Sequence, residues 1–449
     1  MELNLKPKRE LNPAQILVLG FAVVILLGGM LLNLPFSSVD GSSVGFVNAI
    51  FTATSAVCVT GLAVVDTGTH WTLFGKVVIM CLIQIGGLGF MTMATAISFV
   101  MGRKISLKSR LVMQEAFNQS TVAGIVRLTQ SVLVVTLTIE GIAALILMTR
   151  FIPIYGWKTG IFFGIFHSVS AFCNAGFDLI GGFRNLMPFV TDPVINFTIM
   201  GLIILGGLGF GVITEIITVR KFSKLSLHAK VVVCMTIALI LSGFVLILLF
   251  EYNNPDTFGG LSWPQKIVAA FFQSVTPRTA GFNTVDMSKY SISAQLITII
   301  LMFIGGSPGS TAGGIKTTTF GLIIAQVVSV IIGKEETEIF KKRIPTEAIN
   351  KALALFSVAM FIVLSVTMIL SITETGHSFM DLIFETTSAF ATVGLSLNVT
   401  PTLSVPGKLI IALTMFAGRL GPLTLIMALA SRQAKKSKIR YPEGKILVG

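Results

Sequence analysis

Long apolar runs and shorter semi-polar runs alternate along this chain in an order that recurs four times. Each recurrence has a long apolar run, a shorter run richer in Ser and Thr, a glycine-containing loop and a second long apolar run. A helix needs about 20 apolar residues to cross ~30 Å of hydrocarbon, so the long runs predict membrane spans. The expected helices lie at 16–34, 44–56 and 73–100; 124–152, 157–171 and 194–219; 231–250, 263–275 and 292–332; and 352–372, 378–389 and 405–430.

The second helix of each set is too short to span the bilayer. About 13 residues rise only ~20 Å, which predicts a re-entrant helix. The pattern therefore predicts an all-α polytopic membrane protein of four fused repeats, each an M1 helix, a pore helix and an M2 helix. Fourfold pseudosymmetry would place the four repeats around a central ion pore. The expected repeats are 1–102, 103–222, 223–334 and 335–432, and a cytoplasmic tail follows at 433–449.

Four similar loops follow the short helices. Their glycines are Gly61, Gly176, Gly281 and Gly394, separated by 115, 105 and 113 residues, and each is followed by Leu or Phe. Four loops around an axis provide rings of backbone carbonyls that replace the hydration shell of a cation, and glycine permits the required backbone angles. The prediction is a filter whose carbonyls bind K⁺. Its residues are Val59, Thr60, Gly61, Asn174, Ala175, Gly176, Thr279, Ala280, Gly281, Thr392, Val393 and Gly394.

A glycine cluster follows each loop, and two explanations for it stay open. The clusters are 86–90, 206–210, 305–309 and, in degenerate form, 417–421. Small residues let membrane helices pack closely, and glycines also allow a bend in a pore-lining helix.

The third repeat carries the most irregular tract, 305–319. Its final apolar stretch, 292–332, would be ~60 Å long as one helix, so it must break within this tract. Irregular backbone at membrane depth survives only against protein or water, which predicts a mobile gate below the filter. Arg419 lies alone in the last apolar run, where a charge costs ~2.5–3.5 kcal/mol, so it needs oxygen partners. The predicted gate residues are Gly305, Gly306, Ser310, Thr311, Gly313, Gly314, Lys316 and Arg419.

Two alternatives for the arginines stay open. Arg419 either latches the tract or has a purely structural role. Arg278 replaces the Cys or Ala of the other loops, and it lies either behind its loop on an acidic partner or at the outer mouth.

Composition agrees with the membrane prediction. The chain is 53% hydrophobic and 12% charged, against about 25% charged residues in soluble domains. The net charge of +13 does not indicate nucleic-acid binding, because 23 of the 33 Lys and Arg lie in five segments that alternate with pairs of apolar helices. That placement is the positive-inside bias, so the protein is expected to be multi-pass with both termini cytoplasmic.

Catalytic chemistry finds no support in the sequence. The four histidines are scattered, and Cys58, Cys81, Cys173 and Cys234 form no C-x-x-C pair, so they are expected to be buried hydrophobes. The chain is not expected to be an enzyme. Two rival functions are the potassium-translocating subunit of an ATP-driven pump and a cation-coupled solute carrier. A carrier would need an acidic residue at mid-membrane, and the nearest candidate is Glu140.

The four loops, the glycine clusters and the tract at 305–319 together resemble the superfamily of Trk, Ktr and HKT potassium transporters over essentially the whole chain. The C-terminal segment 441–449 is similar to that of Ktr-type subunits. The resemblance implies a bacterial plasma-membrane protein that takes up K⁺, with Na⁺ as an activator. It also implies a homodimer bound to a cytosolic ring of nucleotide-binding (RCK) domains, and it makes 305–319 the gating loop. Glycine rather than serine at Gly61 implies a preference for potassium.

Overall fold

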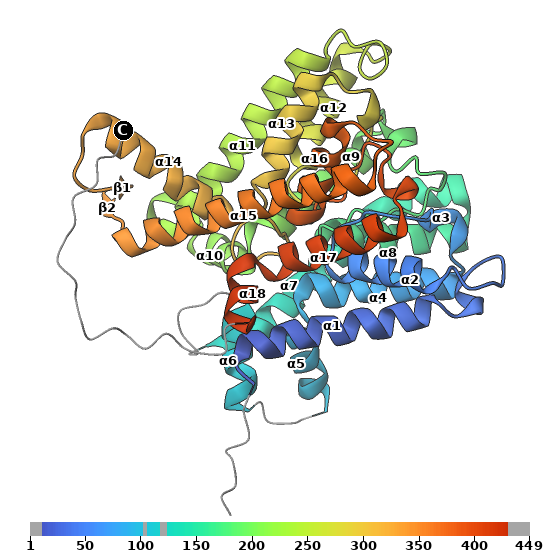
Figure 1. The fold of residues 1–449 in the computed structure, drawn as a ribbon, viewed down its shortest axis with the longest axis horizontal. Helices are drawn as coiled ribbons and strands as arrows, with labels where there is room; N and C mark the ends of the chain where they lie inside the picture. Colours follow the sequence, from blue (N-terminus) through green and yellow to red (C-terminus); the bar gives the residue numbers. More distant parts are fainter. Residues whose placement is uncertain (1–10, 102–105, 117–123, 430–449) are drawn as a thin grey trace, which may run out of the picture.

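The computed structural model describes residues 11–101, 106–116 and 124–429 and is mostly helical (Figure 1). The predicted tail at 433–449 lies outside this range. Four units follow one another along the chain. The first contains α1 (Pro13–Leu32), α2 (Phe46–Val57), α3 (Thr67–His70), α4 (Leu73–Leu88), α5 (Phe90–Val100) and α6 (Leu107–Ala116). The second contains α7 (Ile125–Tyr155), α8 (Trp157–Phe172), α9 (Pro193–Leu208) and α10 (Phe210–Val219).

The third unit contains α11 (Leu227–Glu251), α12 (Trp263–Val275), α13 (Ile292–Phe303) and α14 (Thr317–Ile332). The fourth contains α15 (Thr346–Thr373), α16 (Phe379–Ala391), α17 (Val405–Leu420) and α18 (Pro422–Leu429). A short antiparallel hairpin, β1 (Glu338–Ile339) with β2 (Lys342–Arg343), joins these two units. Short 3-10 turns lie at Pro35–Ser37, Met187–Phe189, Phe222–Lys224, Met287–Lys289 and Thr400–Thr402.

The first helix of each unit is long, and α1, α7, α11 and α15 are each apolar and long enough to cross a membrane. These four belong to a fold of four M1–pore-helix–M2 repeats, as the sequence predicts. Among the described residues, the bent pair α9–α10 qualifies as a fifth span if it is counted as one. The helices that form the other M2 segments are shorter, because each M2 segment is broken into two helices.

The breaks extend the sequence prediction, which required an interruption in the third unit and left either a bend or close packing open at the other glycine clusters. The stretch 73–100 breaks at Gly89, 194–219 at Gly209 and 405–430 at Gly421, with φ of 83°, 96° and 81°. An α-helix requires negative φ, and glycine is the residue that adopts these positive values at little cost. At Gly209 the two helix axes differ in direction by 100°. All four M2 helices are therefore two-part, and the third differs in having thirteen residues, 304–316, between its parts.

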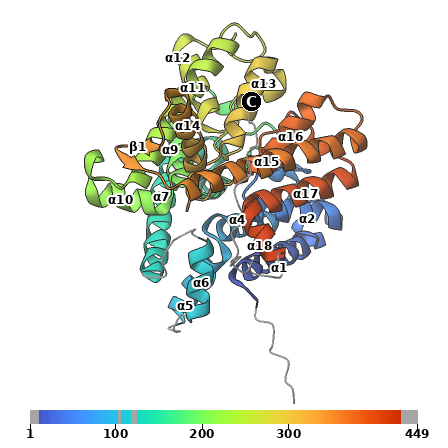
Figure 2. The same cartoon turned by 60° about the vertical axis from the view of Figure 1, so that its left-hand side comes forward.

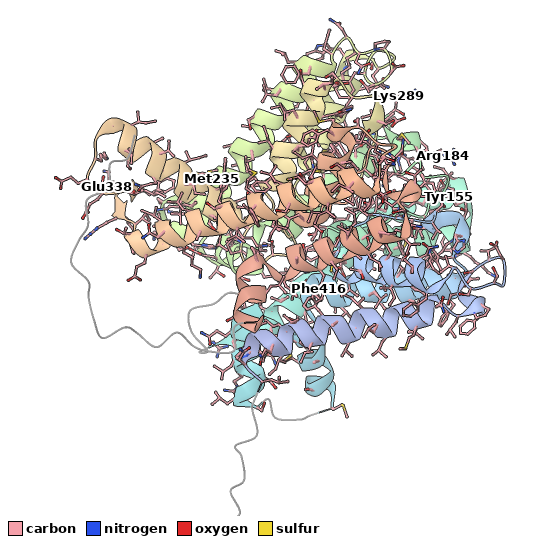
Figure 3. All side chains as sticks on the ribbon, in the orientation of Figure 1. Tyr155, Arg184, Met235, Lys289, Glu338 and Phe416 are labelled. Carbon is pink, nitrogen blue, oxygen red and sulfur yellow. The ribbon has the colours of Figure 1, made fainter. Side chains whose placement is uncertain are left out.

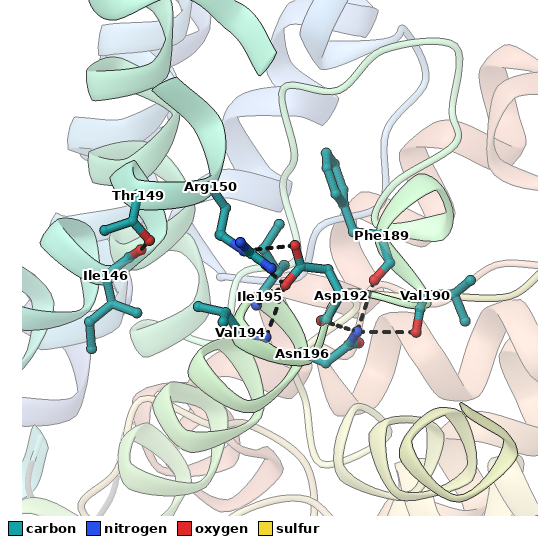
Figure 4. Close-up of polar contacts among 9 residues, drawn as sticks. All are labelled: Ile146, Thr149, Arg150, Phe189, Val190, Asp192, Val194, Ile195 and Asn196. Atoms are coloured by element: carbon teal, nitrogen blue, oxygen red, sulfur yellow. Dashed lines mark hydrogen bonds and ion pairs between the residues drawn. The ribbon is translucent and has the colours of Figure 1, made fainter. Parts of the chain in front are cut away.

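In the second, third and fourth units, side chains link the end of M1 to the beginning of M2. In the second unit, Asp192 accepts hydrogen bonds from the backbone of Val194 and Ile195 at the start of α9 and pairs with Arg150 of α7 (Figure 4). A cap of this kind satisfies backbone N–H groups that a helix leaves free, and carboxylates suit the positive end of the helix dipole. Asn196 adds three hydrogen bonds to the carbonyls of the preceding turn.

The third and fourth units use a carboxylate for the same purpose. Glu251 at the end of α11 accepts from the backbone and hydroxyl of Ser291, the N-cap of α13. Glu374 after α15 accepts from the backbone and hydroxyl of Ser404, the N-cap of α17. This repeated link holds the beginning of M2 beside the end of M1.

The units surround a common core. Figure 2 shows α2, α16 and α17 on one side of the molecule and α9, α11 and α12 on the other. Figure 3 places Glu338 at one end of the long axis and Tyr155 and Arg184 at the opposite end. The short helices α2, α8, α12 and α16 end between these extremes, and the residues that follow them are nearly all buried.

Candidate functional site

The four glycine loops, 58–62, 173–177, 278–282 and 391–395, meet around one axis. A Cβ added to Gly61 would lie closer than 3.0 Å to the carbonyl oxygen of Ala175, and one added to Gly176 would meet that of Ala280 in the same way. The contacts continue cyclically, from Gly281 to the oxygen of Val393 and from Gly394 to that of Thr60. Each glycine therefore faces the carbonyl before the next glycine, and the ring closes.

The loops also share an unusual backbone. The residue two positions before each glycine has a positive φ: 50° at Val59, 57° at Asn174, 69° at Thr279 and 53° at Thr392. Such angles cost of order 1–3 kcal/mol outside glycine and persist only where surrounding structure imposes them. All four residues are fully buried. The recurrence at equivalent places shows that one loop conformation is built four times.

Hydroxyl groups at the ends of the short helices support this conformation. Ser55 and Ser388 accept hydrogen bonds from the N–H of Gly61 and Gly394, each at 3.0 Å. Ser170 donates to the carbonyl of Phe177 at 2.8 Å, and Thr276 donates to that of Phe282. In the third loop Thr276 takes the place of the serine. It stands five residues before its glycine, whereas each serine stands six residues before its own.

A cavity of about 290 Å³ lies on the side of the residues that follow the glycines. All four glycines line it, together with Asp178, Asp286 and several Asn, Ser and Thr side chains from the outer loops. Burial raises the pKa of Asp178 from 3.8 to about 6, and the nearby Asp66 contributes to the increase. The ring of carbonyls thus opens into a polar, acidic vestibule, an environment that attracts cations.

The short helices end directly before the loops, so the four C-termini converge on the ring. They end at Val57, Phe172, Val275 and Ala391. The C-terminal end of an α-helix carries about half a negative charge, which stabilises a cation placed nearby. Helix dipoles, carbonyls and vestibule carboxylates therefore act in the same direction.

The segment 304–316 lies on the opposite side of the ring, against residues that precede the glycines. Ser307 and Thr311 donate backbone hydrogen bonds to the carbonyls of Gly207 and Gly206, at 2.9 and 3.2 Å. The Thr311 hydroxyl lies 3.2 Å from the carbonyl oxygen of Phe172, the last residue of α8. These bonds attach the segment to the break in the second unit.

The same segment reaches the fourth unit. A Cβ added to Gly313 would lie closer than 3.0 Å to the Thr392 hydroxyl, and one added to Gly314 would lie 3.2 Å from Ala391 Cβ. Inside the segment, Lys316 donates to the carbonyl of Ala312 at 2.6 Å, and Ser310 donates to that of Ser307 at 2.6 Å. Gly305 packs against Gly313, and the Gly306 carbonyl accepts from Thr317. The predicted tract 305–319 is three residues too long, because Thr317–Thr319 begin α14.

Arg419 joins this segment to two further units. Its guanidinium donates to the carbonyl of Thr311, as the sequence predicts, and also to those of Gly86 and Gly87 in the first unit. The sequence did not reveal the two α4 carbonyls, since only the tertiary structure brings α4 beside α17.

Three of the glycine clusters have the close-packing role that the sequence left open. A Cβ on Gly86 or Gly206 would lie closer than 3.0 Å to the carbonyl at the end of α2 or α8. Gly418 makes the same approach to Phe390 in the fourth unit. Gly418, rather than Ala417, is therefore the counterpart of Gly86, and Arg419 occupies the place of Gly87.

The structure decides the position of Arg278. The side chain is 5% exposed and lies behind its loop, where it donates to the carbonyl of Thr236 on α11 at 3.3 Å. Within the described residues Arg278 forms no ion pair, so the acidic partner considered from the sequence is not found there.

Two polar residues behind the second loop also belong to the site. Glu140 of α7 is 6% exposed and accepts from the Gln84 side chain of α4 at 3.2 Å. The Cys173 sulfur lies 3.7 Å from Gln84 and 3.9 Å from Glu140. The sequence singled out Glu140 but not Gln84; the available signal was a lone amide inside an apolar run.

Comparison with known proteins gives a consistent result. A family model described as TrkH, cation transport protein, matches residues 7–439. The chain is 46% identical to Ktr system potassium uptake protein B of Bacillus subtilis, over 98% of this chain and 97% of that protein. It is 41% identical to potassium/sodium uptake protein NtpJ of Enterococcus hirae, over 98% of both chains. The crystal structure of the potassium transporter TrkH from Vibrio parahaemolyticus matches with a TM-score of 0.73 at 18% identity, over 96% of this chain and 87% of that one.

Proposed function

The chain belongs to the TrkH family of cation transport proteins, and from this premise we propose that it is the ion-translocating membrane subunit of a Ktr- or Trk-type potassium uptake system. In this proposal K⁺ passes through the ring formed by the four glycine loops. Two relatives that match along almost their whole length, at 46% and 43% identity, are named as potassium uptake proteins.

The closed cyclic contact between the loops carries the proposal. Each glycine accommodates the carbonyl of the next unit, so four oxygens stand at equivalent places around the axis. Backbone carbonyls in such rings replace the water that a cation loses on entering a pore. Four converging helix C-termini and the vestibule carboxylates lower the cost of that exchange further.

The segment 304–316 is proposed as the gate. It contacts the second and fourth units immediately below the ring, and Arg419 ties it to the first. The half-buried positive charges of Arg419 and Lys316 oppose the passage of a cation while the segment is in place. Opening would require the Arg419–Thr311 hydrogen bond and the bonds to Gly206 and Gly207 to break together.

Assembly and regulation are proposed from family membership alone. They comprise a homodimer, a cytosolic RCK ring, activation by Na⁺, and a bacterial plasma membrane with both termini cytoplasmic. The end of α14 and the β1–β2 hairpin carry exposed charges on Lys334, Glu336, Glu338 and Arg343. In this proposal they face the RCK ring on the cytoplasmic side.

Uptake of ⁸⁶Rb⁺ by liposomes containing only the purified protein tests the proposed function. We expect uptake down a potassium gradient without ATP, with competition by K⁺ at much lower concentration than by Na⁺. Uptake that strictly requires a co-purified ATPase would instead support a pump subunit. Uptake of an organic solute coupled to cation entry would support a carrier.

A further inference from the structure

Because the four units repeat, the residues packed behind one glycine loop can be compared with their counterparts behind the next. The residues behind the second and third loops differ in charge. Ser168 of α8 donates to the carbonyl of Glu140, and Ser274 of α12 donates to that of Ile240. Ser168 and Ser274 stand two residues before Ser170 and Thr276, the hydroxyls that bond across their loops. Ile240 of α11 is therefore the counterpart of Glu140 of α7.

The same comparison identifies the counterparts of Gln84 and Cys173 behind the third loop. Gly206 and Gly86 pack on equivalent carbonyls, which makes Ile204 the counterpart of Gln84. Cys173 and Arg278 both stand three residues before the glycine of their loop. Behind the second loop there is thus a carboxylate, an amide and a thiol. Behind the third loop there are two isoleucines and an arginine.

A small cavity lies beside that arginine. It measures about 10 Å³ and is lined by Ile203, Ile204, Gly207, Thr236, Val275 and Arg278. A volume of this size admits one particle of about the size of a water molecule. Thr236 is 5% exposed, and its hydroxyl has no hydrogen-bond partner among the described residues. The cavity therefore presents a guanidinium and a free hydroxyl between apolar walls.

The charge of Arg278 is incompletely balanced. An isolated charge in a low-dielectric interior is costly, and a guanidinium does not lose its proton. The end of α12 supplies at most about half a negative charge. Among the described residues the guanidinium donates one hydrogen bond, to the carbonyl of Thr236, of the five that it can donate, and no carboxylate lies on it. A neutral water molecule in the cavity would leave this imbalance in place.

We propose that the cavity between α9, α11 and the third glycine loop is a binding site for a small monovalent anion, with chloride as the physiological ligand. The anion accepts hydrogen bonds from Arg278 and Thr236 and balances the positive charge of the guanidinium. The site would stabilise the third loop, and it does not depend on which cation the ring conducts.

Thermal unfolding in chloride and in gluconate, at constant potassium concentration, tests the site. We expect the unfolding midpoint to rise with chloride concentration and to saturate. Ile240→Glu places a carboxylate at the counterpart of Glu140 and should abolish the chloride dependence. Ile240→Gln has the same shape without the charge and should keep it. Arg278→Cys, which installs the residue of the second loop, should also abolish it.

Bromide provides a test that needs no variant. A crystal of the wild-type protein grown in bromide should show an anomalous peak in the cavity within hydrogen-bonding distance of Arg278. The proposal fails if the cavity holds only water in bromide. It fails equally if wild type shows no halide-dependent midpoint, or if Ile240→Glu and Ile240→Gln respond identically to chloride.

Discussion

At the residue scale, the four loop glycines are constrained twice, by backbone angle and by space. Their φ values are 93°, 69°, 77° and 93°, and a Cβ on any of them would collide with a carbonyl of the neighbouring unit. Any side chain there must therefore displace one of the oxygens that face the axis. The need for glycine at each of these positions is therefore set by the position of a carbonyl oxygen in the adjacent repeat.

Substitution of Gly176 or Gly281 by Ala should alter discrimination between cations. The added methyl displaces the carbonyl of Ala280 or Val393, so we expect the preference for K⁺ over Na⁺ to fall about tenfold or more, equivalent to ~1.4 kcal/mol. Inhibition of ⁸⁶Rb⁺ uptake by each ion in liposomes measures this. Gly201→Ala, in open space on α9, is the matched control and should behave as wild type. Unchanged discrimination in both loop variants would contradict the proposed filter.

The loop hydroxyls should contribute to stability and to selectivity together. Ser55→Ala or Ser388→Ala removes the acceptor for a glycine N–H, and we expect a loss of about 1 kcal/mol in unfolding free energy. The thermal midpoint and the Na⁺ inhibition constant should change in the same variants. Ser42→Ala, exposed in an outer loop, serves as the control. A lowered midpoint with unaltered selectivity would reduce these serines to a structural role.

At the scale of elements, the broken M2 helices are the feature that positions the candidate gate. The break at Gly209 brings α9 and α10 to 100° and leaves the carbonyls of Gly206 and Gly207 free to accept from Ser307 and Thr311. A continuous helix would use those carbonyls internally. The break therefore provides the acceptors that hold the segment 304–316.

Gly209→Ala should weaken the attachment of that segment. Alanine is strained at a φ of 96°, and its Cβ would lie within 3.0 Å of the Pro308 carbonyl. We expect faster hydrogen exchange in 304–316 and a lower thermal midpoint, with a cost of at least 1 kcal/mol. Gly211→Ala, two residues later in open space, should change neither. Equal exchange in the two variants would show that the break does not control the segment.

Removal of the Arg419 contact should raise basal conduction. Arg419→Ala removes a half-buried positive charge and the donors to Thr311 and Gly86, so we expect several-fold greater ⁸⁶Rb⁺ flux without any regulatory partner. Deletion of 309–314 should have the same effect. Arg110→Ala, exposed on α6, controls for a general change in charge. Flux equal to wild type in both gate variants would leave Arg419 as a structural residue.

At the scale of the whole molecule, the four units combine their electrostatics in one place. Four helix C-termini and the vestibule carboxylates act on the same cavity. Burial and the neighbouring Asp66 raise the pKa of the vestibule group Asp178 to about 6. Above that value the carboxylate is charged and attracts cations, and below it the group is neutral.

Potassium uptake should therefore depend on the pH at the vestibule side. Acidification from pH 7 to 5 should protonate Asp178 and raise the apparent KM for K⁺, with a smaller effect on the maximal rate. Asp178→Asn should show the raised KM at both pH values. Initial rates in liposomes with controlled external pH measure this. An Asp178→Asn variant that keeps the wild-type pH dependence would assign the titration to another group.

The sequence by itself determined the repeat architecture and the identity of its loops. Apolar run length distinguishes spanning from re-entrant helices, and four registered glycines predict loops of one kind. It also determined that Arg419 needs oxygen partners, because a charge in an apolar run is costly wherever it lies. These conclusions depend on local composition and spacing along the chain.

Only the tertiary structure decided how the units meet. Which carbonyl faces which glycine, the equivalence of Gly418 with Gly86, and the α4 carbonyls beside Arg419 all join residues that are far apart in the chain. The breaks at Gly89 and Gly421 were likewise not distinguished from close packing, because a glycine permits both. The sequence shows that the loop glycines need space and that Arg419 needs oxygen acceptors. Only the folded arrangement of the four units determines which residues provide them.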